Sequence, residues 1–242
     1  MVTVSAATAV PAGLLGQWQV IQVAVDGSDQ PHWLYFPNDP RLLGRLLTVD
    51  QDVIQRADGS LACKSPTFAA LPTETLQHFI GRNFRRPPAY ETPPLPTLAD
   101  FDLHLPNVAV SPLQIHCKSQ DPFWDDTWWV LTGNRMLIGK PGGPDVLVLR
   151  RLSPHEPIRA SFDCAKASSV VEKTICDSRA LATYDRSVAA AYRGRLLRTD
   201  KPRAVIQKAQ RRWLKTRDAC GANAACLEQS MRQRVDDLMQ QW

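Results

Sequence analysis

The residues of this sequence best suited to chemistry are its six cysteines. Cys220 and Cys226 lie six residues apart in the stretch RRWLKTRDACGANAACLEQ, and the others are at positions 63, 117, 164 and 176. A structural zinc site takes four converging ligands, usually with a two-residue gap within each pair. Here the gaps are eleven and five residues, and residues 156–242 contain no histidine. A thioredoxin-like site needs C-x-x-C, which is absent. We therefore expect no metal and no cofactor.

Disulfide bonds are the remaining use for these cysteines, and they persist in oxidising compartments. An even number of cysteines stands in each half of the chain, as a disulfide framework requires. The sequence does not fix the connectivity, but proximity along the chain favours Cys63 with Cys117, Cys164 with Cys176, and Cys220 with Cys226. Six reduced, buried cysteines are the alternative. The disulfide interpretation predicts a periplasmic, secreted or envelope-associated protein.

Other catalytic patterns are missing or weak, so we expect no catalytic residue and no enzyme. The motifs G-x-S-x-G, H-E-x-x-H and G-x-x-x-x-G-K do not occur. His116 and Cys117 are neighbours, but adjacent strand residues point to opposite faces. Neighbouring carboxylates such as Asp236 and Asp237 rarely converge on one reacting atom. An enzyme of an unfamiliar type stays open as an alternative.

Charge and composition change near residue 155 and predict two domains. Residues 1–155 carry 12 Lys and Arg against 14 Asp and Glu, net −2, whereas residues 156–242 carry 17 against 10, net +7. We expect a tail at 1–13 left by removal of a signal peptide, a first domain at 14–152, a linker at 153–160 and a second domain at 161–242. No apolar run approaches the roughly 18 residues that span a bilayer, so no stable membrane insertion is expected.

The first domain has the pattern of short antiparallel strands. LLGQWQVIQVAVDG predicts one strand, residues 46–65 predict two strands joined around Asp58-Gly59, and residues 126–152 predict three strands with turns at Gly133-Asn134 and at 141–145. The proline-rich stretch 84–106 predicts a surface loop. These elements favour an antiparallel β-barrel or sandwich. Trp18 in Gly16-x-Trp18, with Arg150 or Arg151 near the last strand, resembles the lipocalin and calycin pattern, which implies that the Arg packs against the Trp.

The second domain is predicted to be a small, disulfide-stapled three-helix domain. Ser169-x-x-Glu172 is a capping box, followed by a helix that is long or broken near Asp177-Ser178. A second helix is predicted from about 200 to 219 through Val205, Ala209 and Trp213, with Gly221 as a stop, and a third after Asn223. The apolar positions expected on the first and third helices are Val171, Ile175, Leu181, Tyr184, Val188, Ala191, Tyr192, Leu227, Met231, Val235 and Leu238. Three short helices bury a modest core, so disulfides are useful to them.

This second domain resembles the LprI-type domain over residues of about 160–240, a helical, disulfide-bonded domain of bacterial envelope proteins. The resemblance rests on SFDCAKASSVVEKTICDSRALATYDRSVAAAYRGRL, QRRWLKTRDACG and AACLEQSMRQRV. Its signature includes residues to which we assign a structural role, namely Phe162, Asp163, Glu172, Asp185, Tyr192, Trp213 and Arg217. The family is named after a lysozyme inhibitor, so the resemblance implies a protein partner, a lysozyme-like peptidoglycan hydrolase or toxin.

Basic residues are numerous in the second half but do not predict nucleic-acid binding. Arg193, Arg203, Lys208, Arg211, Arg212 and Lys215 are among them. They are expected to spread around the helices without aromatic platforms. Solvated helix faces are one interpretation, and an anionic partner in the envelope is the other.

Two functions are compatible with these patterns. The first is a periplasmic inhibitor or immunity protein that occludes the cleft of a peptidoglycan-cleaving enzyme, with Arg82, Arg85, Arg86 and Tyr90 on the proline-stiffened loop as partner-binding residues. The alternative is an envelope binding protein whose barrel holds a small apolar ligand or a cell-wall component. Five tryptophans suit such a cavity, and they suit a packed core equally well: Trp18, Trp33, Trp124, Trp128 and Trp129.

Overall fold

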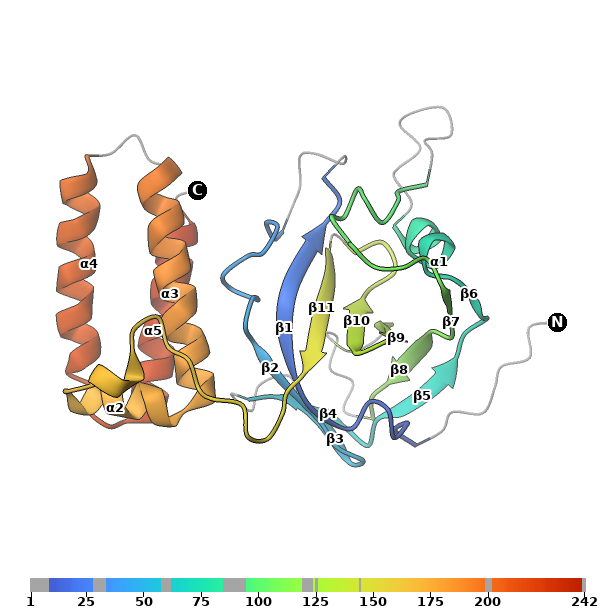
Figure 1. Ribbon diagram of the computed structural model, residues 1–242, viewed down its shortest axis with the longest axis horizontal. Helices are drawn as coiled ribbons and strands as arrows, with labels where there is room; N and C mark the ends of the chain where they lie inside the picture. Colours follow the sequence, from blue (N-terminus) through green and yellow to red (C-terminus); the bar gives the residue numbers. More distant parts are fainter. Residues whose placement is uncertain are drawn as a thin grey trace. The chain divides into compact units, whose positions relative to one another are not determined.

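The computed structural model describes residues 9–27, 34–57, 62–84, 95–118, 124, 126–143, 145–198 and 202–240. The chain divides into two compact units. Unit 1 comprises residues 1–39 and 46–153, and unit 2 comprises residues 40–45 and 154–242. The fold class predicted from the sequence is confirmed, because unit 1 is an antiparallel β structure and unit 2 is a disulfide-bonded helical structure (Figure 1).

Unit 1 contains a curled sheet of nine antiparallel strands in the order β4-β3-β2-β1-β11-β10-β9-β8-β5. The strands of this sheet are β1 (Gly16–Val25), β2 (Leu46–Val49), β3 (Val53–Arg56), β4 (Cys63–Lys64), β5 (Thr67–Ala70), β8 (Leu113–His116), β9 (Trp128–Thr132), β10 (Arg135–Gly139) and β11 (Asp145–Arg151). A two-stranded ribbon pairs β6 (Glu74–Thr75) with β7 (Ala109–Val110). One helix, α1 (Leu76–Asn83), follows β6 within the described residues.

The first strand carries an irregularity that its sequence already shows. Trp18 and Val20 are buried on one parity, whereas Val23 and Val25 are buried on the other. The register between β1 and β11 shifts between Val20 and Gln22. A β-bulge inserts one extra residue and moves the following side chains to the opposite face. Trp18 lies opposite Arg151 in this pairing, and the guanidinium of Arg151 lies 4.3 Å from the centroid of the Trp18 ring, the packing that the sequence implied.

A disulfide joins edge strand β4 to the end of β8, two strands that are far apart in the order of the sheet. Cys63 in edge strand β4 is bonded to Cys117, which follows β8. Beside it the amide of Lys118 donates a hydrogen bond to the carbonyl of Lys64, at 3.2 Å. The two cysteines are 54 residues apart, and chain-entropy estimates give about 4 kcal/mol for a loop of that length. This bond therefore holds the sheet in its curled form.

Both faces of the sheet are covered by packed side chains. Helix α1 packs on the face that carries Trp128 (Figure 1) and contributes Phe79, whose ring centroid is 5.0 Å from that of Trp128. Phe84 packs against Trp128 as well, at 6.0 Å. Trp18, Trp124, Trp128 and Trp129 are all buried. Trp18 and Trp129 face the opposite side of the sheet from Trp128, so these tryptophans belong to packed core on both faces, in agreement with the packed-core interpretation. Trp33 lies outside the described residues.

Two details of unit 1 differ from the sequence prediction. Residues 46–65 form three strands instead of two, because a tight turn at 50–52 separates β2 from β3 and the amide of Asp50 bonds the carbonyl of Val53 at 2.9 Å. The predicted turn at Asp58-Gly59 lies outside the described residues. Helix α1 had no counterpart in the prediction, and Thr75 caps it by accepting a hydrogen bond from the amide of His78.

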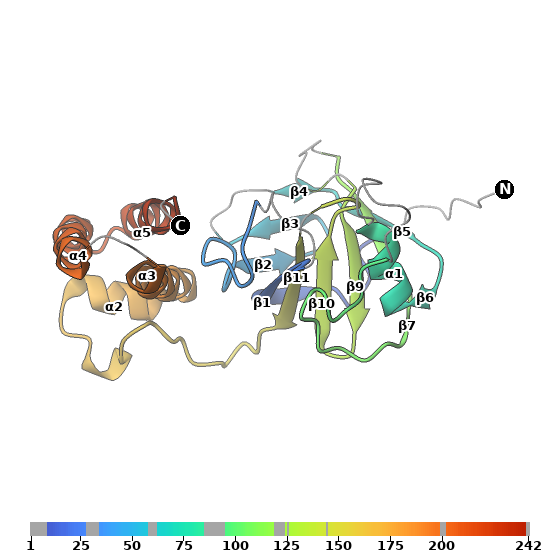
Figure 2. The same ribbon diagram turned by 90° about the horizontal axis from the view of Figure 1, so that it is seen from above.

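Unit 2 has three long helices, which stand side by side in Figure 2, and a short one packed at their end. Its elements are η1 (Cys164–Lys166), α2 (Val170–Asp177), α3 (Arg179–Arg198), α4 (Arg203–Asp218) and α5 (Ala224–Met239). The predicted capping box is present at Ser169 and Glu172, and the predicted break separates α2 from α3. The apolar residues expected on α2, α3 and α5 are buried, with Tyr192 half-buried.

The buried face of helix α4 differs from the face predicted from the sequence. Val205 and Ala209 are exposed, whereas Ile206 and Arg217 are buried. The helix has few large apolar residues, so a shift of one position in the stripe was not visible in the sequence. Gly221 follows the helix at φ +55°, a left-handed conformation that glycine adopts without strain.

Candidate functional site

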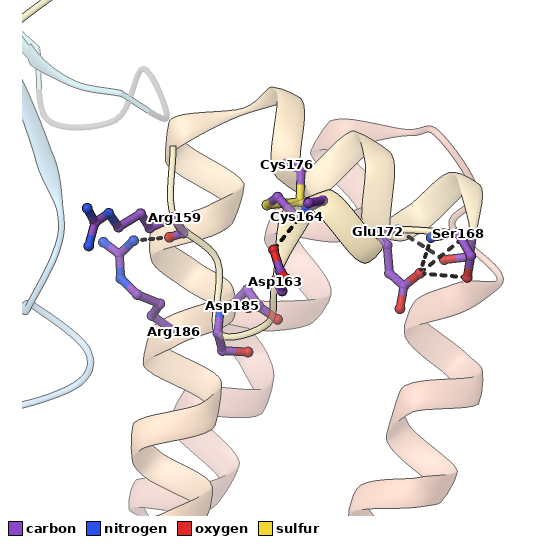
Figure 3. Close-up of a disulfide and its surroundings, with 11 residues drawn as sticks. Arg159, Asp163, Cys164, Ser168, Glu172, Cys176, Asp185 and Arg186 are labelled. Atoms are coloured by element: carbon purple, nitrogen blue, oxygen red, sulfur yellow. Dashed lines mark hydrogen bonds between the residues drawn. A yellow bond between two sulfur atoms is a disulfide. The ribbon is translucent and has the colours of Figure 1, made fainter. Parts of the chain in front are cut away.

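The start of unit 2 is a short segment, residues 163–176, that we call the stapled turn. The side chain of Asp163 accepts a hydrogen bond from the amide of Ala165 at 3.0 Å and so caps η1. The disulfide between Cys164 and Cys176 then joins η1 to the last turn of α2 (Figure 3). The chain-entropy estimate for this 12-residue separation is about 3 kcal/mol. Both ends of the stapled turn are therefore fixed before any partner binds.

Hydrogen bonds fix the middle of the stapled turn. Glu172 accepts hydrogen bonds from the amides of Ser169 and Ser168, at 3.0 and 2.9 Å, and its own amide donates to the Ser169 hydroxyl at 3.1 Å. The backbone hydrogen bonds from Ser169 and Ser168 stabilise the carboxylate and lower the pKa of Glu172 to about 2. The side chain is thus ionised at neutral pH and holds the first turn of α2 in one conformation.

The outer surface of the stapled turn exposes one large apolar side chain and two cations. Val170 is 60% exposed, although it begins a helix whose next residue, Val171, is buried. The Lys166 side chain is 84% exposed and its ammonium lies 3.9 Å from an Asp163 carboxylate oxygen. Lys173 is exposed too. A rigid, exposed segment with an apolar contact and cations next to it has the properties of a protein-binding element.

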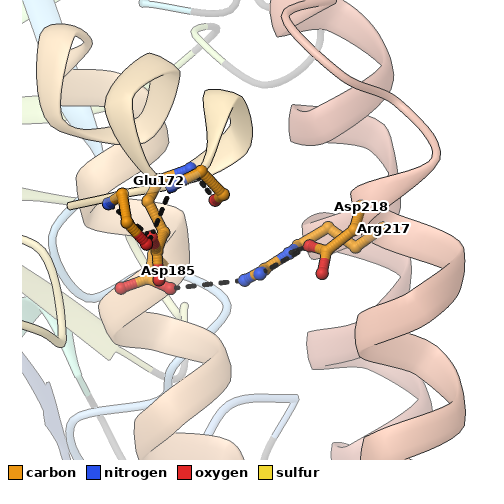
Figure 4. A network of polar contacts seen from close by, with 6 residues as sticks. Glu172, Asp185, Arg217 and Asp218 are labelled. Atoms are coloured by element: carbon orange, nitrogen blue, oxygen red, sulfur yellow. Dashed lines mark hydrogen bonds and ion pairs between the residues drawn. The ribbon is translucent and has the colours of Figure 1, made fainter.

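Asp185 and Arg217 form a buried ion pair between α3 and α4 (Figure 4). Arg217 Nη1 lies 3.9 Å from Asp185 Oδ1, and the two side chains are 11% and 8% exposed. Asp185 also accepts a hydrogen bond from the amide of Ser161 at 2.6 Å, and Arg217 donates to Asp218 at 2.8 Å. These two residues of the sequence signature thus connect three parts of unit 2: helix α3, helix α4 and the segment around Ser161 that precedes η1.

Trp213 and Arg234 connect α4 with α5. The Arg234 guanidinium lies 5.8 Å from the Trp213 ring centroid and donates to the Gln210 side chain at 3.0 and 2.8 Å. Burial lowers the pKa of Arg234, and the nearby side chains of Asp237 and Tyr192 act in the opposite direction. Phe162 and Tyr192 are half-buried. The contacts described for Asp163, Glu172, Asp185, Trp213 and Arg217 lie within unit 2, and a structural role for all seven signature residues stays a prediction.

The outward side of α4 gathers cations on one face, contrary to the even spread expected from the sequence. Lys208, Arg211, Arg212 and Lys215 are all exposed and recur at the spacing of one helical face. The pattern within α4 is hidden when the basic residues of all the helices are considered together.

Arg82 is the only one of the four loop residues predicted to bind a partner that falls within the described part of the chain. Arg85, Arg86 and Tyr90 lie outside it. Arg82 is in α1, and its Nε donates to a Glu74 oxygen at 2.7 Å, while His78 contacts the other Glu74 oxygen. Burial raises the pKa of Glu74, but hydrogen bonds from Arg82 and His78 outweigh it and hold that pKa below its ordinary value.

These three side chains line an open pocket of about 530 Å³ on unit 1. The other lining residues are Leu71, Pro72, Asn83, Gln114, Asp126, Trp128 and Pro141. Gln114 donates to Asp126 at 3.2 Å on the same pocket wall. Sequence reasoning found Arg82 but missed Glu74 and His78. The spacing of Glu74, His78 and Arg82, four residues each, was the available signal, because it aligns side chains along one face of a helix.

Comparison with known proteins identifies the helical unit. The family model described as "Lysozyme inhibitor LprI" matches residues 164–238. These residues form an LprI-type domain. Lipoprotein LprI of Mycobacterium bovis and of two strains of Mycobacterium tuberculosis are each 28% identical to this chain over 81 residues. The match covers 32% of this chain and 40% of each relative, so less than half the length of the relatives is represented. No solved structure matches the chain.

The matched range places the stapled turn, the Asp185–Arg217 pair and the basic side of α4 in the LprI-type domain. Unit 1, with Arg82 and its pocket, lies outside the match to the family model. Among the described residues there is no group of three or more His, Cys, Asp or Glu side chains that could hold a metal ion. Within the same residues, no helix combines the length and apolar character needed to cross a membrane.

Proposed function

We propose that this protein is a bacterial envelope inhibitor or immunity protein that blocks a peptidoglycan-cleaving enzyme. The observation that carries the proposal is the match of residues 164–238 to the lysozyme-inhibitor family. The three disulfides support an oxidising compartment, the periplasm or the outside of the cell, as the place of action.

The stapled turn is the part of the LprI-type domain that we assign to the enzyme's cleft. It is held by a disulfide, by the cap at Asp163 and by the capping box at Glu172, so little conformational entropy is lost when it binds. Val170 supplies an apolar side chain that is exposed to solvent in the free protein and would be buried by a partner. Buried side chains such as Asp185 and Arg217 are engaged inside the domain and serve to hold it in shape.

Charge supports this assignment, because glycoside hydrolases carry a pair of carboxyl groups beside the scissile bond. A cation placed near them gains favourable electrostatic energy in a cleft from which water has been displaced. Lys166 is accessible for this contact, since its side chain is 84% exposed and its ion pair with Asp163 is a long one of 3.9 Å. The second half of the chain has a net charge of +7, so we expect faster association with an acidic target than with a strongly basic one.

The direct test is the rate at which host-type and toxin-type muramidases lyse a peptidoglycan suspension in the presence of the intact protein. We expect at least one enzyme to be inhibited as the protein approaches an equimolar ratio. Replacing Lys166 and Val170 together by Ala weakens that inhibition by about tenfold or more if they form the contact core. Lys215→Ala, which removes one exposed cation from α4, is the matched control and leaves inhibition unchanged. An enzyme panel that is unaffected throughout contradicts the proposal.

The predicted loop contact through Arg82, Arg85, Arg86 and Tyr90 remains a separate prediction for unit 1. Arg82 is already bound to Glu74, so its guanidinium is only partly available to a partner. Arg82→Ala in the same lysis assay separates the two surfaces. We expect it to inhibit as well as the unaltered protein, and lost inhibition would favour the loop.

A second candidate function is the binding of a cell-wall component by unit 1, and the pocket beside α1 favours it. Its volume lies in the range of small-molecule sites, and it combines an apolar floor with convergent polar groups. The packed tryptophans of the sheet interior favour this open pocket over an apolar ligand inside the barrel. Calorimetric titration with soluble peptidoglycan fragments tests the idea. Saturable binding that Arg82→Ala and Gln114→Ala weaken supports it, and no heat of binding contradicts it.

A further inference from the structure

The outward side of α4 is a surface in its own right, which we call the basic face: Ala204, Val205, Lys208, Arg211, Arg212 and Lys215. All six residues are exposed, and the other three cations lie three, four and seven positions after Lys208. Residues at this spacing share one side of a helix and extend about 10 Å along it. The buried residues of α4, Ile206 and Arg217, belong to the opposite side.

The four cations are not neutralised inside the protein. None of their side chains has an ion-pair or hydrogen-bond partner among the described residues, whereas Arg217 and Arg232 are paired with Asp218 and Glu228. Within α4 the one acidic residue is Asp218 at its last position, and it is bound to Arg217. Like charges at these spacings repel one another and destabilise a helix. An external anionic partner would relieve this repulsion.

The shape and composition of the basic face decide among anionic partners. Unlike the stapled turn, this face is dominated by cations, with four of them beside one exposed valine, and it has no aromatic anchor; such a composition favours a diffuse anionic surface over a packed protein interface. Binding of single-stranded nucleic acid relies on stacked aromatic platforms, which are missing here as well. Its apolar side chains, Ala204 and the 55% exposed Val205, are small and stand in the first turn.

We propose that the basic face of α4 docks on the surface of a membrane that contains anionic phospholipids. Cations lining a convex helix attract such a surface without needing a pocket, and apolar side chains beside them enter the headgroup region. Contact of this kind lies in the interface plane and does not require a spanning segment. It is independent of enzyme inhibition, which we assign to the stapled turn, and it would keep that turn close to the membrane.

The test is sedimentation of the intact protein with vesicles of phosphatidylglycerol and phosphatidylcholine, compared with vesicles of phosphatidylcholine alone. We expect binding to the anionic vesicles only, with weaker binding as salt is raised. Each Lys or Arg near such a surface contributes about fivefold to partitioning, so Arg211→Gln with Lys215→Gln lowers binding about 25-fold. The matched control, Lys173→Gln with Arg193→Gln, removes two exposed cations from α2 and α3 and changes binding less than about twofold.

Circular dichroism of both double variants checks that the helices are intact, which is expected because all four positions are exposed and Gln is a good helix former. Equal losses in the two variants would show attraction by net charge alone and overturn the proposal. Absence of binding to anionic vesicles would also contradict the proposal. This holds even if soluble polyphosphate binds through the same cations, because the partner would then be a soluble polyanion and not a membrane.

Discussion

The buried pair of Asp185 and Arg217 makes a quantitative prediction about the stability of the LprI-type domain. At 3.9 Å and an effective dielectric constant of about 20, the attraction between the two charges is about 4 kcal/mol before the cost of desolvation is subtracted. Both side chains are nearly inaccessible, so that cost offsets most of the gain. The larger effect appears when one partner is removed and the other stays buried.

Arg217→Met leaves the Asp185 carboxylate with a hydrogen bond from the Ser161 amide but without its cation, and it should destabilise the domain by about 3 kcal/mol. Asp185→Asn leaves Arg217 bound to Asp218, so the loss is smaller, about 2 kcal/mol. In the double variant no charge is stranded. We therefore expect the double variant to lose less than the sum of the single losses, with a coupling energy of about 1–2 kcal/mol.

Urea unfolding of the oxidised protein, followed by far-ultraviolet circular dichroism, measures these free energies in the helical unit. Asp218→Asn is the control, because that carboxylate is 53% exposed, so solvent weakens its attraction to Arg217 and the loss is expected to be about 1 kcal/mol or less. Losses that add to within about 0.5 kcal/mol would show that Asp185 and Arg217 do not act as a pair, and the structural role assigned to them would be wrong.

Three further predictions concern the other structural features. Replacing Cys63 and Cys117 together by Ser should lower the free energy of unfolding of unit 1 by about 4 kcal/mol, measured by urea denaturation with tryptophan fluorescence, and an unchanged midpoint would contradict the role given to this bond. The folded-state pKa of Glu172 lies below its ordinary value of 4.5, at about 2, so its stabilising effect is complete above pH 4.5 and is lost as the pH falls towards 2. The stability difference between the unaltered protein and Glu172→Gln should shrink over that window, and a difference independent of pH would refute the capping argument. Gly139→Ala would place a methyl group 2.4 Å from the Trp128 ring and should destabilise unit 1 by about 1–3 kcal/mol in thermal unfolding, whereas an unchanged melting temperature would show that the ring moves freely.

Local signals in the sequence predicted much of the fold. The capping box at Ser169 and the break after Asp177 each determine backbone geometry through neighbouring residues, so the sequence alone reveals them. Nearness along the chain also predicted the three cysteine pairs that the structure contains. Cys164–Cys176 and Cys220–Cys226 close short stretches of 12 and 6 residues, which need little knowledge of the tertiary fold, whereas Cys63–Cys117 spans 54 residues and depends on how the sheet curls.

Features that depend on tertiary packing were missed. The inward side of α4 is set by its neighbours, because Ile206 alone is a weak apolar signal and Arg217 faces inward to meet Asp185 on another helix. The pocket beside α1 joins Glu74, His78 and Arg82 to Gln114 and Asp126 from distant parts of unit 1, which no local pattern indicates. The basic face became apparent only when exposure could be assigned residue by residue.

Hydrogen–deuterium exchange of the intact protein, mixed in turn with each muramidase of the panel, tests the central claim most directly, since it reports both binding and its location. We expect at least one enzyme to slow exchange in the stapled turn, residues 163–176, while the strands of unit 1 exchange as in the free protein. Exchange that no enzyme changes, or protection confined to unit 1, would contradict the claim that the LprI-type domain is the inhibitory part of this chain.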